Sequence, residues 1–217
     1  MRNSKGFTLI EIIVAVALVA ILSAAVAPSV LNNIAMGRIS RTQSDVQAIA
    51  SGVMRFKSDT GKYPRLDTPA NPDTLGEAFD FLVSTNGTWP TLVTNANWPS
   101  SAAALVTGIG AGSAQTITNH LIIGQNDYAT TTSDTYIRAN NPEDPTDVGF
   151  RQGYISSDPP DPWGNRYMIN VAPLGMVGQP VWVISAGPNG VLETLITNVG
   201  TATLDTVNGD DIGFRVQ

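Results

Sequence analysis

Few residues of this 217-residue chain have the types and spacing that catalysis needs. Cysteine is absent, which excludes disulfides, thiolate zinc sites and cysteine nucleophiles. His120 is the single histidine and no nucleophile motif accompanies it, so an anchored hydrolase has only this residue and scattered carboxylates in its favour. The glycines of residues 108–112 lack the spacing and the following lysine of a nucleotide loop, so we expect a flexible loop there. The formal charge of −6 argues against a nucleic-acid partner.

One acid inside an apolar stretch is the strongest chemical signal. Glu11 is the only charged residue between Phe7 and Gly37. Residues 7–30 would form about 36 Å of helix, enough to cross the core of a bilayer. A carboxylate this deep in such a helix is costly unless it finds a partner.

Three ordinary interpretations compete for this stretch: a cleavable secretory signal with a small-residue site near 25–27, a plain signal anchor, and a buried core helix. Glu11 fits the first two poorly, and the stretch is too long and too uniformly apolar for the third. Arg2 and Lys5 precede it, so the positive-inside rule predicts a single-pass segment with a cytoplasmic N-terminus.

The string KGFTLIE at residues 5–11 resembles the class III prepilin signal of type IV pilins and type II secretion pseudopilins. The resemblance implies that residues 1–6 are a leader, that prepilin peptidase cuts after Gly6, and that Phe7 becomes the methylated N-terminus. Glu11 would then be the fifth residue of the mature chain, and Pro28 the twenty-second, where many members of the family carry proline. The implied partners are copies of the chain in a helical filament, an inner-membrane platform and a cytoplasmic ATPase.

The predicted cut gives Glu11 a partner. The new amine of Phe7 lies at the membrane depth of the carboxylate, so the amine of one subunit can pair with Glu11 of a neighbour in the filament. The carboxylate is costly in the membrane in a single subunit. Pairing would remove this cost in the filament and would align neighbouring subunits. Snorkelling of Glu11 to the lipid headgroups remains the alternative before assembly.

The helical pattern continues beyond the membrane segment through residues 31–60. One apolar stripe recurs at steps of three and four, and it consists of Ile39, Thr42, Val46, Ile49, Val53 and Phe56. We therefore expect one helix of about 78 Å whose second half is amphipathic. Pro28 should kink or locally unwind this helix, and Gly61 should end it.

The remaining residues, 61–217, are predicted to form a globular head in which residues 65–157 are a variable insertion. We expect a short helix at 75–83, an apolar patch at 102–106 and a buried strand at 120–123. Turn chemistry at 161–164 then precedes candidate strands at 166–171, 181–185 and 212–216. A three-stranded antiparallel sheet over the apolar stripe would give an α+β fold.

Residues 158–217 resemble the G-type major pseudopilin, through the strings DPWGNRY and SAGPNG. In that subfamily the loop after the strand and a late pair of aspartates bind calcium. Carried over by position, the ligands would be the Ala186 carbonyl, the Asn189 side chain and the carboxylates of Asp210 and Asp211. Oxygen ligands suit calcium, but Asn189 replaces a common aspartate, and a solvated turn at Asp210 and Asp211 is the alternative.

The function predicted from the sequence is structural. We expect a type IV filament subunit, most similar to a type II secretion pseudopilin, held in the inner membrane before assembly. After assembly it would lie in a periplasmic pseudopilus or an extracellular filament. Two alternatives stay open: the major pilin of a type IV pilus, and a minor tip subunit that acts as a binding module.

Overall fold

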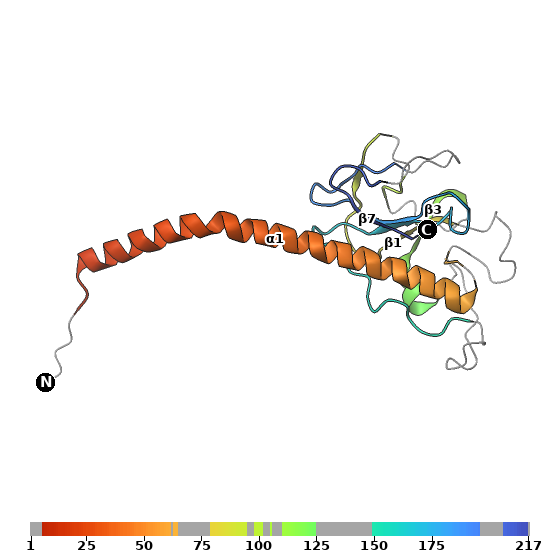
Figure 1. Cartoon of the computed structure of the whole chain (residues 1–217), viewed down its shortest axis with the longest axis horizontal. Coiled ribbons are helices and arrows are strands. Elements are labelled where there is room, and N and C mark those ends of the chain that lie inside the picture. The colour runs from red at the N-terminus through yellow and green to blue at the C-terminus, as the bar shows by residue number, and fades with distance from the viewer. Residues whose placement is uncertain are drawn as a thin grey trace. The chain divides into compact units, whose positions relative to one another are not determined.

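The computed structural model describes residues 6–61, 63–64, 79–94, 98–101, 105, 110–124, 149–195 and 206–216. Its elements in chain order are α1 (Leu9–Thr60), β1 (Phe79–Val83), β2 (Thr91–Leu92), β3 (Gly110–Thr116), the π-helix η2 (Thr118–Ile123), β4 (Met168–Asn170), β5 (Trp182–Ser185), β6 (Val191–Leu192) and β7 (Ile212–Arg215) (Figure 1). The chain divides into two compact units, residues 1–40 and 41–217, so the boundary falls inside α1.

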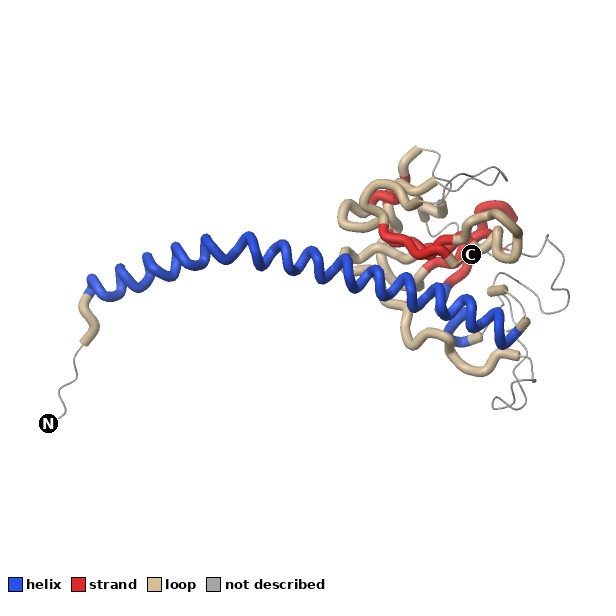
Figure 2. Tube along the Cα trace, in the orientation of Figure 1, coloured by secondary structure: helices blue, strands red, loops and turns tan. Residues whose placement is uncertain are grey.

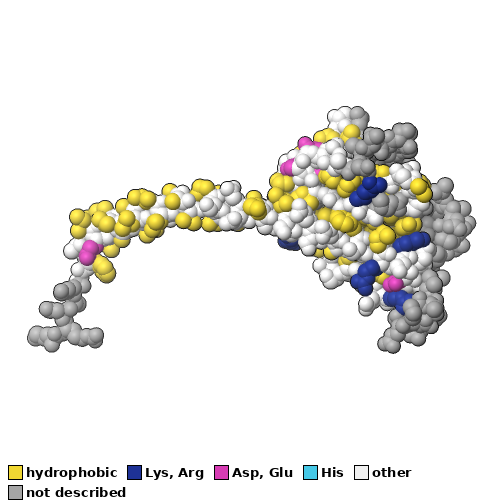
Figure 3. Space-filling model, viewed as in Figure 1, with side chains coloured by type: hydrophobic (Ala, Val, Ile, Leu, Met, Phe, Trp, Pro, Cys, Tyr) yellow, Lys and Arg dark blue, Asp and Glu magenta, His cyan; other side chains and the backbone are white. Residues whose placement is uncertain are grey.

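The first unit is the N-terminal part of α1. Its large apolar side chains are exposed, and Figure 3 shows them in yellow along the helix. The expected single helix is confirmed, because α1 covers 52 residues and includes Pro28. The helix passes through Pro28 without interruption, so the expected local unwinding is absent. A proline ring suits the helical φ angle and removes only one backbone donor, and the turns on either side can continue.

The end of α1 follows the expected chemistry. Gly61 takes a φ of 70°, a left-handed conformation that favours glycine. Its N–H still donates to the carbonyl oxygen of Lys57 at 3.0 Å, and the Lys57 ammonium donates to the Gly61 carbonyl oxygen at 2.6 Å. Gly61 therefore ends the helix as predicted.

The second unit has its core on the predicted stripe. The stripe residues buried there are Thr42, Val46, Ile49, Val53 and Phe56. The four apolar members of this set join one apolar cluster with strand residues that include Leu82, Ile169 and Val183. The spacing of three and four puts these side chains on one face of α1, which is why one helix covers the sheet.

The sheet contains more strands than the sequence indicates. Its order is β3-β1-β4-β5-β7, with β3 parallel to β1 and the other neighbours antiparallel. Figure 2 draws the strands in red. The expected three-stranded antiparallel unit is present as β4, β5 and β7, and the α+β class is confirmed. The middle of the chain adds β1 and β3, and a separate pair joins β2 to β6.

Three local predictions were wrong or incomplete, and a fourth lies mostly outside the described residues. Residues 79–83 of the predicted helix form β1, because Phe81, Leu82 and Val83 are buried in the sheet; residues 75–78 lie outside the described residues. The predicted strand at 120–123 is part of η2, which buries His120 and Leu121. The predicted glycine-rich loop enters β3 at Gly110, since pairing with β1 overrides the low strand propensity of glycine. Of the apolar patch at 102–106, only Leu105 lies within the described residues, and it packs against buried core residues.

Candidate functional site

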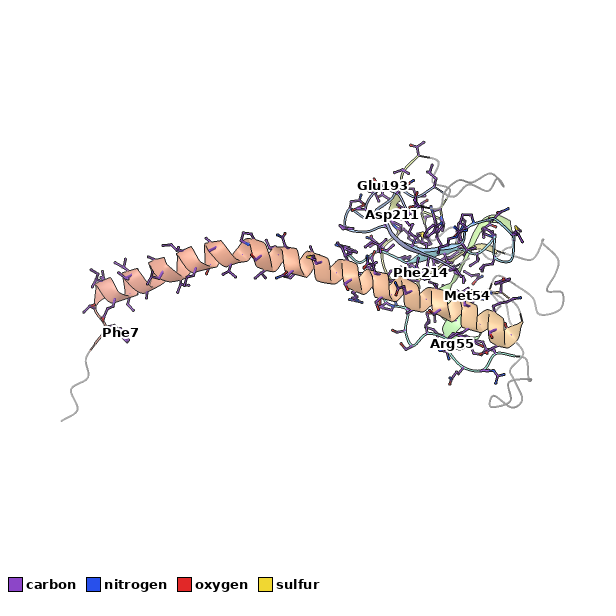
Figure 4. All side chains as sticks on the ribbon, in the orientation of Figure 1. Phe7, Met54, Arg55, Glu193, Asp211 and Phe214 are labelled. Atoms are coloured by element: carbon purple, nitrogen blue, oxygen red, sulfur yellow. The ribbon has the colours of Figure 1, made fainter. Side chains whose placement is uncertain are left out.

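The predicted processing and assembly residues lie in the first unit: Gly6 and Phe7 just before α1, Glu11 in its first turn, and Pro28 farther along the helix. Phe7 precedes the helix and is 85% exposed (Figure 4). Gly6 lies beside it, exposed, with nothing within 4 Å of the position that a Cβ would occupy. The bond between Gly6 and Phe7 is therefore outside regular structure and free of packing contacts.

Glu11 closes the first turn of α1. Its Oε2 atom accepts hydrogen bonds from the backbone N–H of Thr8 at 2.9 Å and from the Thr8 hydroxyl at 2.8 Å. The N–H of Glu11 points back to the Thr8 hydroxyl at 3.4 Å. This reciprocal arrangement is a capping box, with Thr8 as the N-cap and Glu11 as the third helical residue.

The capping box is a role that the sequence reasoning missed. The spacing of Thr8 and Glu11 before an apolar run is its signature. It follows that the Glu11 carboxylate already has two donors within its own chain, in addition to any partner that assembly supplies.

The second group of predicted residues lies on two loops that follow β5 and precede β7. Asn189 donates its N–H to Oδ2 of Asp210 at 3.0 Å. A Cβ added at Gly187, where φ is 63°, would overlap the carbonyl oxygen of Asp210. Ala186 is buried directly beside this close approach. The structure therefore brings Ala186, Asn189 and Asp210 to the same place.

Asp211 anchors the same pair of loops from the other side. Its Oδ2 atom accepts hydrogen bonds from the Glu193 N–H at 2.9 Å, the Thr194 N–H at 2.7 Å and the Thr194 hydroxyl at 2.7 Å. Burial nevertheless raises the pKa of Asp211 to about 6. The Oδ1 atoms of Asp210 and Asp211 are both buried and accept no hydrogen bond. Two carboxylate oxygens are thus left without a partner.

Glu193 belongs to this group, although the sequence reasoning did not select it. Its Oε2 atom accepts the Asp210 N–H at 3.2 Å, and its carboxylate occupies the space that a Cβ at Gly209 would fill. Figure 4 labels Glu193 and Asp211 at the same end of the sheet. Nothing in the local pattern VLETL signals this contact, because it forms only when the loop meets the Asp210 turn.

The donor set fits a hard cation only in part. Oxygen is the donor atom that calcium prefers, and the two unpaired Oδ1 atoms are available. The Asn189 side-chain oxygen, in contrast, already accepts the Val191 N–H at 2.6 Å. Within the described residues, no three His, Cys, Asp or Glu side chains form a group that could hold a metal. Main-chain carbonyls and water would have to complete the coordination.

A cleft of about 390 Å³ in the second unit lies between α1 and residues 154–159. Asp45 and Tyr167 line it, and the Tyr167 hydroxyl donates to Asp45 Oδ2 at 2.9 Å. His120 is not among the lining residues; its burial lowers its pKa to about 3. His120 is therefore buried and neutral at physiological pH.

Comparison with known proteins shows which proteins the chain is similar to. A family profile described as "Prokaryotic N-terminal methylation motif" matches residues 1–27. Type II secretion system core protein G of Escherichia coli (strain K12) is 24% identical over 201 residues, which cover 91% of this chain and 92% of that protein. The chain is a homologue of type II secretion core protein G. The similarity extends over most of the chain and includes the prepilin motif at its N-terminal end.

Shorter matches to the same protein occur in other bacteria. Core protein G of Pseudomonas aeruginosa is 38% identical over 63 residues, which span 29% of this chain and 44% of that protein. The Vibrio cholerae protein is 31% identical over 81 residues, or 34% of this chain and 56% of that protein. The chain thus spans about half the length of these two relatives. No solved structure matches the chain.

The core protein G homology is consistent with the hydrophobic character of α1. Among the described residues, α1 is the one helix that is long and apolar enough to cross a membrane. An 18-residue window within it has a mean hydropathy of 2.8 and no buried residues. The prepilin motif therefore leads directly into a helix with the composition of a membrane segment.

Proposed function

We propose that the chain is a pseudopilin subunit that prepilin peptidase cuts between Gly6 and Phe7 and that then polymerises from the inner membrane into a type II secretion pseudopilus. The supporting observation is the exposed Gly6–Phe7 bond next to an apolar, unburied helix, together with the homology to core protein G. The lipid holds this helix before assembly, and like helices replace the lipid afterwards. An inner-membrane platform and an ATPase of the secretion machinery supply the work.

The processing step is tested by the intact mass and N-terminal residue of the protein made in a host that contains prepilin peptidase. We expect a chain that begins at methylated Phe7. A Gly6→Val variant should keep all six leader residues. A start near Pro28 in the wild type would instead identify a cleaved secretory signal and would refute the proposal.

Glu11 has two possible contributions, and the capping box allows them to be separated. A glutamine at position 11 keeps the hydrogen bonds of a capping box but loses the charge, whereas Thr8→Val keeps the charge and loses the cap. If the carboxylate pairs with the Phe7 amine of a neighbour, Glu11→Gln abolishes filaments while Thr8→Val still forms them. Wild-type filament yield from Glu11→Gln, with normal membrane insertion of both variants, would rule the pairing out.

We also propose that the paired loops 186–194 and 208–211 bind calcium. The buried, unpaired Oδ1 atoms of Asp210 and Asp211 support this, because buried carboxylate oxygens without donors are costly unless a cation meets them. Bound calcium would supply positive charge to these two oxygens, and the loops themselves are positioned by the hydrogen bonds of Glu193 and Thr194. Calorimetric titration of chelator-treated full-length protein with calcium tests the site, with Asp210→Asn as the variant that should lose binding.

A further inference from the structure

Asparagine followed by glycine occurs three times in the chain, at Asn86-Gly87, Asn189-Gly190 and Asn208-Gly209. This dipeptide is chemically reactive because glycine has no Cβ to shield its amide nitrogen. The nitrogen can attack the side-chain carbonyl carbon of the asparagine and close a five-membered imide. Two of the three dipeptides lie on the paired loops 186–194 and 208–211, which makes their reactivity relevant to this site.

Asn189 has a local geometry that favours the attack. Its side-chain oxygen accepts the Val191 N–H at 2.6 Å, so a backbone donor is already aimed at the oxygen on which negative charge develops. The Gly190 nitrogen must lose its proton and its hydrogen bond in the attack. That hydrogen bond, to the Gly187 carbonyl oxygen, is long at 3.3 Å. Asn189 is also exposed, so water reaches the product.

The other two asparagines lack this arrangement. Asn208 uses its side-chain nitrogen in a 3.4 Å contact with the Glu193 carbonyl, which holds the amide without polarising its carbonyl group. Asn86 lies in an exposed bend. Among the contacts of the described residues, Asn189 is the one of the three whose side-chain carbonyl accepts a backbone N–H.

We propose that Asn189 is a self-modification site, at which deamidation to aspartate installs a further carboxylate that strengthens divalent-cation binding by the paired loops. The Gly190 nitrogen forms a bond to Cγ of Asn189, the bond from Cγ to the side-chain nitrogen breaks, and ammonia leaves with the proton from Gly190. Water then adds to the imide at Cγ and reopens the ring. The Gly190 N–H is restored, a carboxylate stands at position 189, and no oxidant or reductant is needed.

The consequence for cation binding follows from the neighbours. The Asn189 N–H is 3.0 Å from Asp210 Oδ2, so the new charge arises beside a carboxylate whose Oδ1 is unpaired. Without a cation, the added charge repels Asp210 and Asp211 and destabilises the loops. With a cation, each added carboxylate raises affinity. This step rests on the proposed calcium site, whereas the deamidation itself does not.

The chemical part is tested by ageing the full-length protein in detergent at mildly alkaline pH in heavy-oxygen water, followed by peptide mapping. We expect the label at position 189 first, ahead of Asn86 and Asn208, and as aspartate in a substantial share of the product. Conversion of Asn86 or Asn208 ahead of Asn189 would overturn the assignment, and so would isoaspartate as the sole product at position 189.

The functional part compares calcium titrations of Asn189→Asp, which carries the product, and Asn189→Gln, which retains an amide and closes the imide far more slowly. We expect Asn189→Asp to bind calcium about tenfold more tightly than Asn189→Gln. On ageing, the calcium affinity of the wild type should rise from that of Asn189→Gln towards that of Asn189→Asp. Equal affinities in two variants that both bind would overturn the inference and leave the calcium proposal standing. If fresh wild type and both variants fail to bind, the calcium proposal fails together with its enhancement.

Discussion

Carboxylates in the second unit differ in whether both of their oxygens accept hydrogen bonds. Asp161 uses both oxygens: Oδ1 accepts the N–H groups of Trp163 and Asn165, and Oδ2 accepts the Ser185 hydroxyl at 2.7 Å. Asp211 accepts three hydrogen bonds on one oxygen and none on the other. Asp161 therefore completes the turn predicted at 161–164, whereas Asp211 keeps capacity for a further ligand.

The raised pKa of Asp211 predicts how stability depends on pH in the absence of calcium. Its ordinary pKa is 3.8 and burial raises it to about 6, so the folded state holds the proton more tightly than the unfolded state. The contribution is fully present below pH 3.8 and is lost as pH rises through about 6. We expect denaturant unfolding with a chelator to show this loss in the wild type relative to Asp211→Asn.

The proposed calcium binding predicts a second difference in stability between the wild type and Asp211→Asn. At neutral pH, added calcium should stabilise the wild type and leave Asp211→Asn unchanged, because the cation offsets the cost of the buried charge. An equal calcium response in both proteins would show that Asp211 is not a ligand.

The contribution of His120 to the free energy of unfolding should depend on pH in the opposite direction. Burial lowers its pKa from 6.5 to about 3, so its contribution to stability is complete above pH 6.5 and is lost as pH falls towards 3. The loss approaches about 1.4 kcal/mol per pH unit between these limits. We expect His120→Gln, which does not titrate, to flatten the acid limb of the free energy of unfolding. An unchanged acid limb would mean that other groups cause the loss.

At the scale of elements, α1 offers a matched pair of substitutions two residues apart. Phe56 is fully buried, and its ring makes edge contacts with Tyr154 at 5.4 Å and Phe150 at 6.3 Å between centroids. Met54 on the same helix is 47% exposed. We expect Phe56→Ala to lower the free energy of unfolding by about 3–5 kcal/mol, and Met54→Ala to change it by less than about 0.5 kcal/mol. Similar losses from both would contradict the orientation of the helix.

The helix was predictable because its information is local. Residues three and four apart define its buried face, and Gly61 marks its end through its own backbone preference. The strands β4, β5 and β7 were predictable for a similar reason, since each is a short apolar run bounded by turn residues.

Strand β1 was not predictable, because its information is not local. The string LGEAFDFLV has apolar spacing that suits a helix, but its residues 79–83 form a strand by pairing with residues 110–116 and 168–170. Strand β3, GAGSAQT, has little strand propensity of its own and depends on the same pairing. In the candidate site, Asn189, Asp210 and Asp211 came from a resemblance, whereas Glu193 is identified only by its contact with the Asp210 N–H.

At the scale of the whole molecule, the two units differ in what they require from the solvent. The exposed large apolar residues are concentrated between Phe7 and Met36, and the second unit has its own core. We expect a fragment that begins at Arg41 to stay soluble and folded without detergent, because it keeps Thr42 to Phe56 and their contacts. Aggregation of this fragment under native conditions, measured by light scattering and circular dichroism, would contradict the division.

The position of β7 in the sheet sets an order of events during synthesis. This edge strand directly follows Asp210 and Asp211, and its partner β5 precedes it by more than two dozen residues. A chain emerges N-terminus first, so the long helix is complete while the sheet still lacks its edge. The paired loops 186–194 and 208–211 come together only when that final strand docks. Their closure therefore marks the completion of the sheet. A subunit truncated before β7 would leave β5 as an unpaired edge strand that is exposed to cellular proteases.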